Sequence, residues 1–102
     1  MSDVAKIILE QLGGRRFVAM TGARNMTSDV DSLTVKLPSR FAKDGINAVK
    51  IKLTPADTYE VIFYRLGRAP TFKVTVVSEH SDVYVDSFRT LFSSETGLAL
   101  SL

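Results

Sequence analysis

Cysteine is absent from this 102-residue chain, and histidine occurs only once, as His80. Without cysteine there is no disulfide, no thiolate chemistry and no zinc site with cysteine ligands. A single histidine likewise excludes a metal site built from several imidazoles. Small secreted domains usually depend on disulfides, so the lack of cysteine favours a reducing compartment, and we expect the protein in the cytoplasm.

Sequence signatures of catalysis are scarce as well. Residues 21–25, Thr-Gly-Ala-Arg-Asn, place a glycine beside an arginine, as anion-binding turns do, but they lack the glycine spacing and the Lys-Ser/Thr pair of a P-loop. No Gly-x-Ser-x-Gly motif offers a nucleophile to His80, which we expect in an exposed loop. The acidic residues are scattered singly rather than paired for hydrolysis. We therefore expect no enzymatic activity, no cofactor and no metal.

Long apolar runs are missing too. No stretch approaches the roughly 20 apolar residues that a membrane-spanning helix needs. The first residues, Met1-Ser2-Asp3, carry an acid and lead into no apolar run that would suit a signal peptide. We therefore expect no contact with a membrane.

What the chain does have is the composition of an ordinary globular domain, with 45% hydrophobic and 24% charged residues. Its length suits a single domain over residues 1–102, and a net charge of +2 is too small to favour disorder. The charge is unevenly distributed, however. Residues 14–75 hold eleven Lys and Arg against five Asp and Glu, whereas residues 1–13 and 76–102 are acidic overall. The middle of the chain is therefore its basic part.

The spacing of apolar residues predicts a helix near each end of the chain. The first helix ends at Gly13 and carries an apolar stripe of Val4, Ile7, Ile8 and Leu12. The second is predicted over residues 82–96, with Ser81 or Asp82 as its N-cap and Gly97 after its last turn.

Between the helices, alternating apolar and polar residues predict strands. Residues 23–31 are polar, and we expect them to be irregular. Short turns between the strands favour an antiparallel meander. The predicted fold is α+β: a four- to five-stranded, mainly antiparallel sheet with the N- and C-terminal helices packed on one face. The predicted strands are residues 17–21, 32–37, 49–53, 59–66 and 71–76.

Pleating sends alternate side chains to opposite faces of such a sheet. If the apolar side chains point at the helices, their neighbours face outwards, namely Thr34, Lys36, Lys50, Lys52, Lys73 and Thr75. The strand predicted at residues 59–66 carries apolar side chains on both faces. We expect Tyr59, Val61 and Phe63 to point inwards, and Ile62 and Tyr64 to lie among the outward lysines. The opposite register would expose Val61 and Phe63 instead.

Two interpretations of this outward side remain open. Lysines around a tyrosine suit single-stranded nucleic acid, because Lys neutralises phosphates and bases stack on the ring. Alternatively, Lys and Thr form the solvated half of the sheet, and Ile62 and Tyr64 pack against a loop or a second subunit. The aromatic-rich signature of an RNA-recognition sheet is absent. With the basic loops included, the candidate residues for nucleic-acid or partner binding are Arg15, Arg16, Arg24, Lys36, Arg40, Lys43, Lys50, Lys52, Tyr64 and Lys73.

A further signal lies in segments 11–14 (Gln-Leu-Gly-Gly) and 17–23 (Phe-Val-Ala-Met-Thr-Gly-Ala), in Asp57-Thr58-Tyr59, and in Tyr84 with Phe92 and Thr96-Gly97-Leu98. Together these residues resemble a family of small, functionally uncharacterised accessory proteins of bacteriophages and mobile elements. The likeness covers most of the chain. It implies a short gene product that acts in a bacterial host cell by binding nucleic acid, a host protein or a signalling nucleotide, and it assigns no functional residue.

The leading hypothesis is a non-catalytic protein that contacts nucleic acid through basic central strands and loops. The competing hypothesis is a protein–protein interaction module, either a homodimer or an inhibitor of a host protein, because residues 59–66 carry apolar side chains on both faces. A protein that sequesters an anionic nucleotide is the third.

Overall fold

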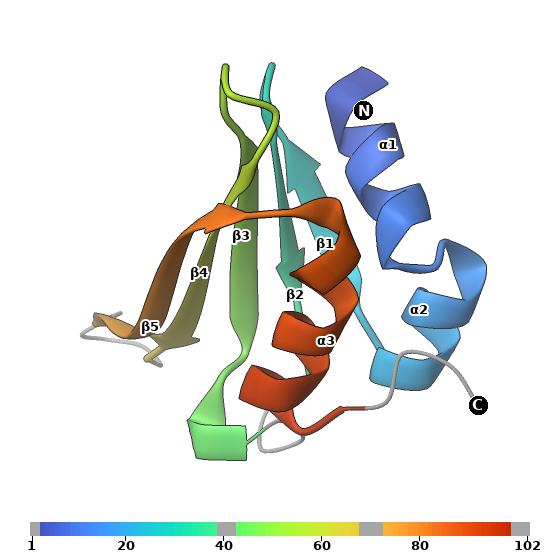
Figure 1. Cartoon of the computed structure of the whole chain (residues 1–102). Coiled ribbons are helices and arrows are strands. Elements are labelled where there is room, and N and C mark those ends of the chain that lie inside the picture. The colour runs from blue at the N-terminus through green and yellow to red at the C-terminus, as the bar shows by residue number, and fades with distance from the viewer. Residues whose placement is uncertain (1–2, 39–42, 68–72, 99–102) are drawn as a thin grey trace.

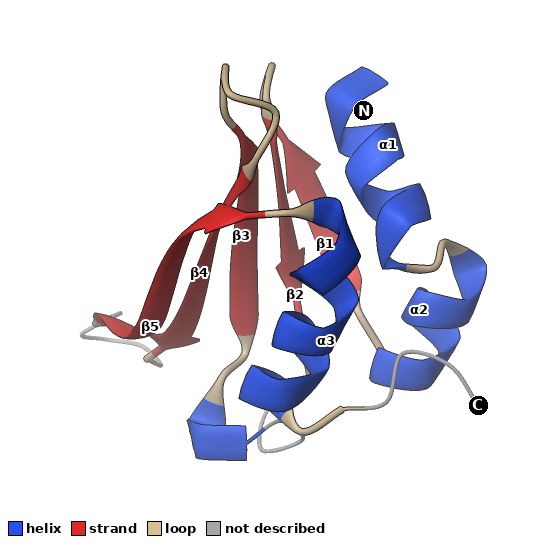
Figure 2. Cartoon of the chain, in the orientation of Figure 1, coloured by secondary structure: helices blue, strands red, loops and turns tan. Residues whose placement is uncertain are grey.

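The computed structural model describes residues 3–38, 43–67 and 73–98, apart from the side chains of Asn25 and Lys43. Five strands form one antiparallel sheet in the order β1-β2-β3-β4-β5, and three helices lie against it (Figures 1 and 2). The helices are α1 (Asp3–Leu12), α2 (Arg15–Thr21) and α3 (Val85–Thr96). The strands are β1 (Arg24–Ser28), β2 (Ser32–Lys36), β3 (Ala48–Leu53), β4 (Tyr59–Leu66) and β5 (Val74–Val83), with a short 3-10 helix η1 (Lys43–Gly45) before β3.

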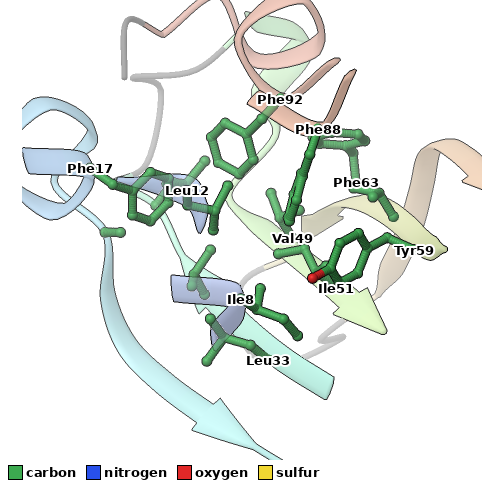
Figure 3. Close-up of a cluster of buried hydrophobic side chains, with 14 of the residues drawn as sticks. Ile8, Leu12, Phe17, Leu33, Val49, Ile51, Tyr59, Phe63, Phe88 and Phe92 are labelled. Atoms are coloured by element: carbon green, nitrogen blue, oxygen red, sulfur yellow. The ribbon is translucent and has the colours of Figure 1, made fainter. Parts of the chain in front are cut away.

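The predicted α+β class is confirmed, including helices from both ends of the chain on one face of the sheet. The strand side chains on that face are fully buried: Leu33, Val35, Val49, Ile51, Val61 and Phe63. Side chains from the helices complete one core, chiefly Ile8, Leu12, Phe17, Phe88 and Phe92 (Figure 3). Burying each such side chain contributes about 1.5–3 kcal/mol. This burial fixes which face of β2, β3 and β4 points towards the helices.

Aromatic rings tie the helices to one another and to the sheet. Phe17 of α2 and Phe92 of α3 meet edge to face, with ring centroids 5.2 Å apart. Phe92 also contacts Phe63 of β4 at 6.0 Å, and Tyr59 packs on Phe88 at 4.8 Å. Such pairs add to the stabilisation that burial alone supplies. The helical layer therefore packs mainly against the central strands.

The strand predicted at 17–21 is wrong, because these residues form the helix α2. Phe17 and Thr21 are both buried at the i, i+4 spacing of one helical face. The Thr21 hydroxyl donates a 2.7 Å hydrogen bond to the carbonyl of Phe17, and Gly22 closes the helix with φ 73°. A short apolar run fits a strand and a buried helix equally well, and here tertiary packing selects the helix.

The irregular segment predicted at 23–31 is also wrong, since it contains β1. This strand pairs with β2 through Arg24 opposite Lys36, Thr27 opposite Thr34 and Ser28 opposite Leu33. One extra residue between Arg24 and Thr27 disrupts the ladder. A polar edge strand with a bulge lacks the alternation by which strands are recognised.

The boundary between β5 and α3 lies later than predicted. The helix begins at Val85 rather than at residue 82, and Tyr84 is its N-cap without a side-chain hydrogen bond. The proposed caps Ser81 and Asp82 instead belong to β5, where Asp82 has a positive φ of 55°. A helix N-cap has extended backbone geometry, which Tyr84 adopts and Asp82 does not. In the described part of the chain, no helix is long and apolar enough to cross a membrane.

Candidate binding surface on the outer sheet face

The side of the sheet opposite the helices, hereafter the outer face, carries the candidate site. Strand pairing places its side chains in rows that cross the sheet. One row runs through Arg24, Lys36, Ala48, Tyr64 and Val76. A second row runs through Thr27, Thr34, Lys50, Ile62 and Glu79. Apart from Ala48, the strands β1 to β3 contribute polar or basic side chains to both rows, and β4 contributes Tyr64 and Ile62.

The basic half of the outer face consists of Arg24, Lys36, Lys50 and Lys52. Arg24 and Lys36 face each other directly on β1 and β2, and both side chains are exposed. Lys52 is neutralised in part, because its Nζ lies 4.0 Å from Asp31 and the strand partner of Lys52 is Glu60. Among the described residues, no acid lies within ion-pair distance of the other three cations. Placing like charges side by side costs free energy that a bound anion would recover.

The apolar half, hereafter the apolar corner, consists of Ile62, Tyr64, Leu66, Val74 and Val76. Tyr64 is half-buried between Ala48 and Val76. Val74 and Val76 are 57% and 51% exposed. Ile62 is the residue paired directly with a lysine, Lys50, whereas Ala48 separates Tyr64 from Lys36. The expectation that Val61 and Phe63 point inwards is confirmed, because both are fully buried.

A side-chain clamp holds β4 in this register beyond the end of β3. Asn47 donates from Nδ2 to the carbonyl of Leu66 at 3.1 Å, and its Oδ1 accepts from the Leu66 amide at 2.8 Å. The Asn47 amide also donates to the carbonyl of Tyr64 at 3.0 Å. The side chain of Asn47 therefore takes the place of a strand partner for Leu66, and its main chain continues the ladder at Tyr64.

The predicted orientation of the last strand is wrong. Val74 and Val76 were expected against the helices, but they point outwards, and Thr75 is half-buried on the helix side. Lys73 is exposed and precedes β5, and strand alternation places it on the side of Thr75, away from Lys50. The cause is a bulge, since Phe63 pairs with Ser78 while Tyr64 pairs with Val76.

The additional residue in this bulge is Val77, and it inverts the alternation. Val77 packs against the core, next to the outward-pointing Val76. Sequence reasoning therefore missed the two valines that border Tyr64 on the outer face. Its available signal was the pair Val76-Val77, because two consecutive apolar residues interrupt a strand that otherwise alternates.

The basic loops are not gathered into the same surface. Arg15 and Arg16 are exposed in the first turn of α2, within the helical layer rather than on the outer face. Arg40 lies outside the described residues. Lys43 begins η1, and its side chain is not among those described. Of the ten candidate residues, the structure brings together Arg24, Lys36, Lys50, Lys52 and Tyr64.

His80 is not in an exposed loop as predicted. It lies in β5, half-buried, with Nε2 2.8 Å from Oε1 of Glu95 on α3. Its ring also meets Phe63 edge to face at 6.0 Å. The pair fastens the second half of β5 to the helical layer and has no part in the outer face. In the regions that the structure describes, no group of three His, Asp or Glu side chains is placed to hold a metal ion.

Comparisons with protein-family models, with curated proteins and with solved structures found no match to this chain.

Proposed function

We propose that this chain is a non-catalytic accessory protein of a bacteriophage or mobile element, acting in the cytoplasm of a bacterial host. Its outer face would bind single-stranded nucleic acid without sequence preference. The observation that supports this proposal is the cluster of Arg24, Lys36 and Lys50 on three adjacent strands, with the half-buried Tyr64 on the same face beyond Ala48. Adjacent strands lie about 4.8 Å apart, so the three cations form one compact positive surface.

Each part of this surface has a defined chemical task. The three cations neutralise phosphates and release counterions, which supplies affinity that depends on salt. Tyr64 offers a flank on which a base stacks, and stacking tolerates every base because each has a π-face. Lysine is a point charge that does not read base edges, so the surface confers little sequence preference.

The test is a salt titration of binding to a fluorescent single-stranded oligonucleotide. Three phosphate contacts predict a slope of log K against log salt of about −2. In Lys36→Gln/Lys50→Gln the slope should be shallower by about 1.4, because two contacts are lost. Lys6→Gln is the matched control, since Lys6 is an exposed lysine on α1, behind the sheet. Absence of binding at low salt, or an equal effect of the Lys6 variant, would refute the proposal.

The role of the ring is tested separately with Tyr64→Leu, which keeps an apolar side chain in the corner. Loss of one stacked base should weaken binding by about 5- to 100-fold while the salt slope stays unchanged. Binding that is as tight in Tyr64→Leu as in the unmodified chain would limit the contact to the phosphates.

A further inference from the structure

The charge of the outer face changes along the strands, from one end of the sheet to the other. In the first row, Arg24 and Lys36 stand opposite each other and together carry a charge of +2. A third row pairs Lys52 of β3 with Glu60 of β4. Lys52 also lies 4.0 Å from Asp31, so one cation and two acids leave this row with a charge of −1. The positive potential is therefore confined to one end of the outer face.

The two rows are far enough apart for this difference to act on a ligand. They are separated by four residue positions on β2, from Lys36 to Ser32, which is a distance of about 13 Å. The Debye length is about 10 Å at 0.1 M salt, so exposed charges at that separation are largely screened from one another. The acids therefore repel an anion at the third row and leave the attraction of the first row largely intact.

One candidate binding group stands on each of four adjacent strands: Arg24 on β1, Lys36 on β2, Lys50 on β3 and Tyr64 on β4. A ligand chain that crosses the strands meets all four groups. A chain laid along β2 or β3 would instead run from the basic first row into the acids of the third. The crossing spans the strand spacings from β1 to β4, about 14 Å in all. At a stacked rise of about 3.4 Å per nucleotide, this length corresponds to about four nucleotides.

We propose that the outer face binds a short single-stranded segment of about four nucleotides, whose backbone crosses the strands from Arg24 to Tyr64. Glu60 and Asp31 end the site on the side of the third row, so these two acids determine its length and its path. This inference rests on the proposed function and adds to it the size and the direction of the ligand. A segment of about four nucleotides is at the lower end of known single-strand sites, as suits three cations and one ring.

The first experiment measures how binding depends on the length of the ligand. Oligothymidines of about two to ten nucleotides are titrated with the full chain at several salt concentrations, with fluorescence anisotropy as the readout. The slope of log K against log salt should reach about −2 at about four nucleotides and stay there in longer ligands. A slope that continues to steepen beyond about six nucleotides would contradict the short crossing path.

The second experiment alters the charges at both ends of the outer face and uses an oligothymidine of about eight nucleotides at about 0.1 M salt. Glu60→Lys opens the third row to one more phosphate, so affinity should rise about 5-fold and the salt slope should steepen by about 0.7. Lys36→Gln should lower affinity about 5-fold, because a phosphate contact is lost. Lys52→Gln should change affinity less than about twofold, because Lys52 already faces two acids.

The comparison for Glu60→Lys is Glu10→Lys, which makes the same change in net charge at an exposed position on α1, in the helical layer. It should alter affinity less than about twofold, and a gain as large as that of Glu60→Lys would overturn the inference by assigning the effect to net charge. Equal losses in Lys52→Gln and Lys36→Gln would overturn it too, while the proposed function would stand. Failure of every oligothymidine to bind at low salt would remove both.

Discussion

The two edges of the sheet differ in almost every respect that governs association. The β1 edge is five residues long, carries Arg24, Thr27 and Ser28, and is interrupted by a bulge. The β5 edge is ten residues long, begins with a run rich in valine, and is likewise interrupted, by two register shifts opposite β4. Polar side chains and irregular pairing keep a strand edge solvated, whereas a β-branched apolar run invites a further strand. The two edges therefore differ chiefly in their side chains, which are polar along β1 and apolar at the exposed beginning of β5.

Attachment to the core differs along β5 itself. Its second half is fastened to the helices by His80, which bonds Glu95, and by the buried Val83. Its first half extends past the helical layer and exposes Val74 and Val76 (Figure 1). A strand that is fixed at one end and exposed at the other presents its edge in a defined position. The contrast between anchored and exposed residues can be tested by substitution.

The largest effect on stability is expected at Phe63, on the core side of β4. Phe63→Ala removes a fully buried ring that contacts Phe92 and His80, and should lower the free energy of unfolding by about 3–5 kcal/mol. Tyr64→Ala, one residue further on, alters the half-buried outer face and should cost about 1 kcal/mol. Urea denaturation measures both. Equal losses would contradict the division of β4 into a core side and a binding side.

A smaller effect of opposite sign is expected at Asp82. Its φ of 55° lies in the left-handed region, which is unfavourable for a residue with a Cβ. Asp82→Gly should therefore raise the free energy of unfolding by about 0.5–1 kcal/mol. Asp82→Ala is the control and should give no gain, because Ala tolerates this conformation less well than Asp. Thermal denaturation of the three proteins would decide. A gain in the Ala variant would mean that φ is not the cause.

The smallest effect concerns Tyr59, which pairs with Val83 at the end of β5. Burial raises the pKa of the Tyr59 phenol above its ordinary value of 10.0, and its hydroxyl donates a hydrogen bond to the side-chain oxygen of Gln11. The folded protein thus prefers the protonated phenol. The preference for the protonated Tyr59 phenol stabilises the folded protein fully below about pH 10. This stabilisation is lost as the pH rises through the pKa that Tyr59 has in the folded protein.

Tyr59→Phe should consequently show a shallower loss of stability between about pH 9 and pH 11 than the unmodified chain. The comparison requires both proteins because it cancels every other contribution to the pH dependence that the two chains share. Parallel stability curves would show that the Tyr59 phenol is not held in its neutral form.

Much of the fold follows from alternation in the sequence. A strand with one buried face must alternate between apolar and polar residues, and this pattern predicts β2, β3 and β4 together with their buried side. The buried apolar residues are Leu33 and Val35 in β2, Val49 and Ile51 in β3, and Val61 and Phe63 in β4. The predictions failed where that signal is absent. Residues 17–21 are too short and too uniformly apolar to separate helix from strand, and β1 is polar throughout.

The candidate site was predictable to the same extent. The positions of Lys36, Lys50 and Tyr64 follow directly from the alternation of β2, β3 and β4. Lys73 was placed wrongly because a single additional residue in β5 lies between it and the part of the strand that the core orients. Whether Arg15 and Arg16 join the surface depends on how α2 packs, which no local pattern encodes.

The additional valine at position 77 has a consequence at the level of the gene. Removing that one codon would restore strict alternation and turn the beginning of β5 over, so that Val74 and Val76 would face the helices and Lys73 and Thr75 would face the solvent. One triplet thus decides whether the outer side of the first half of β5 carries two valines or a lysine and a threonine. An insertion or deletion at this point would change the polarity of the exposed surface of a descendant in a single step and leave β2, β3 and β4 untouched.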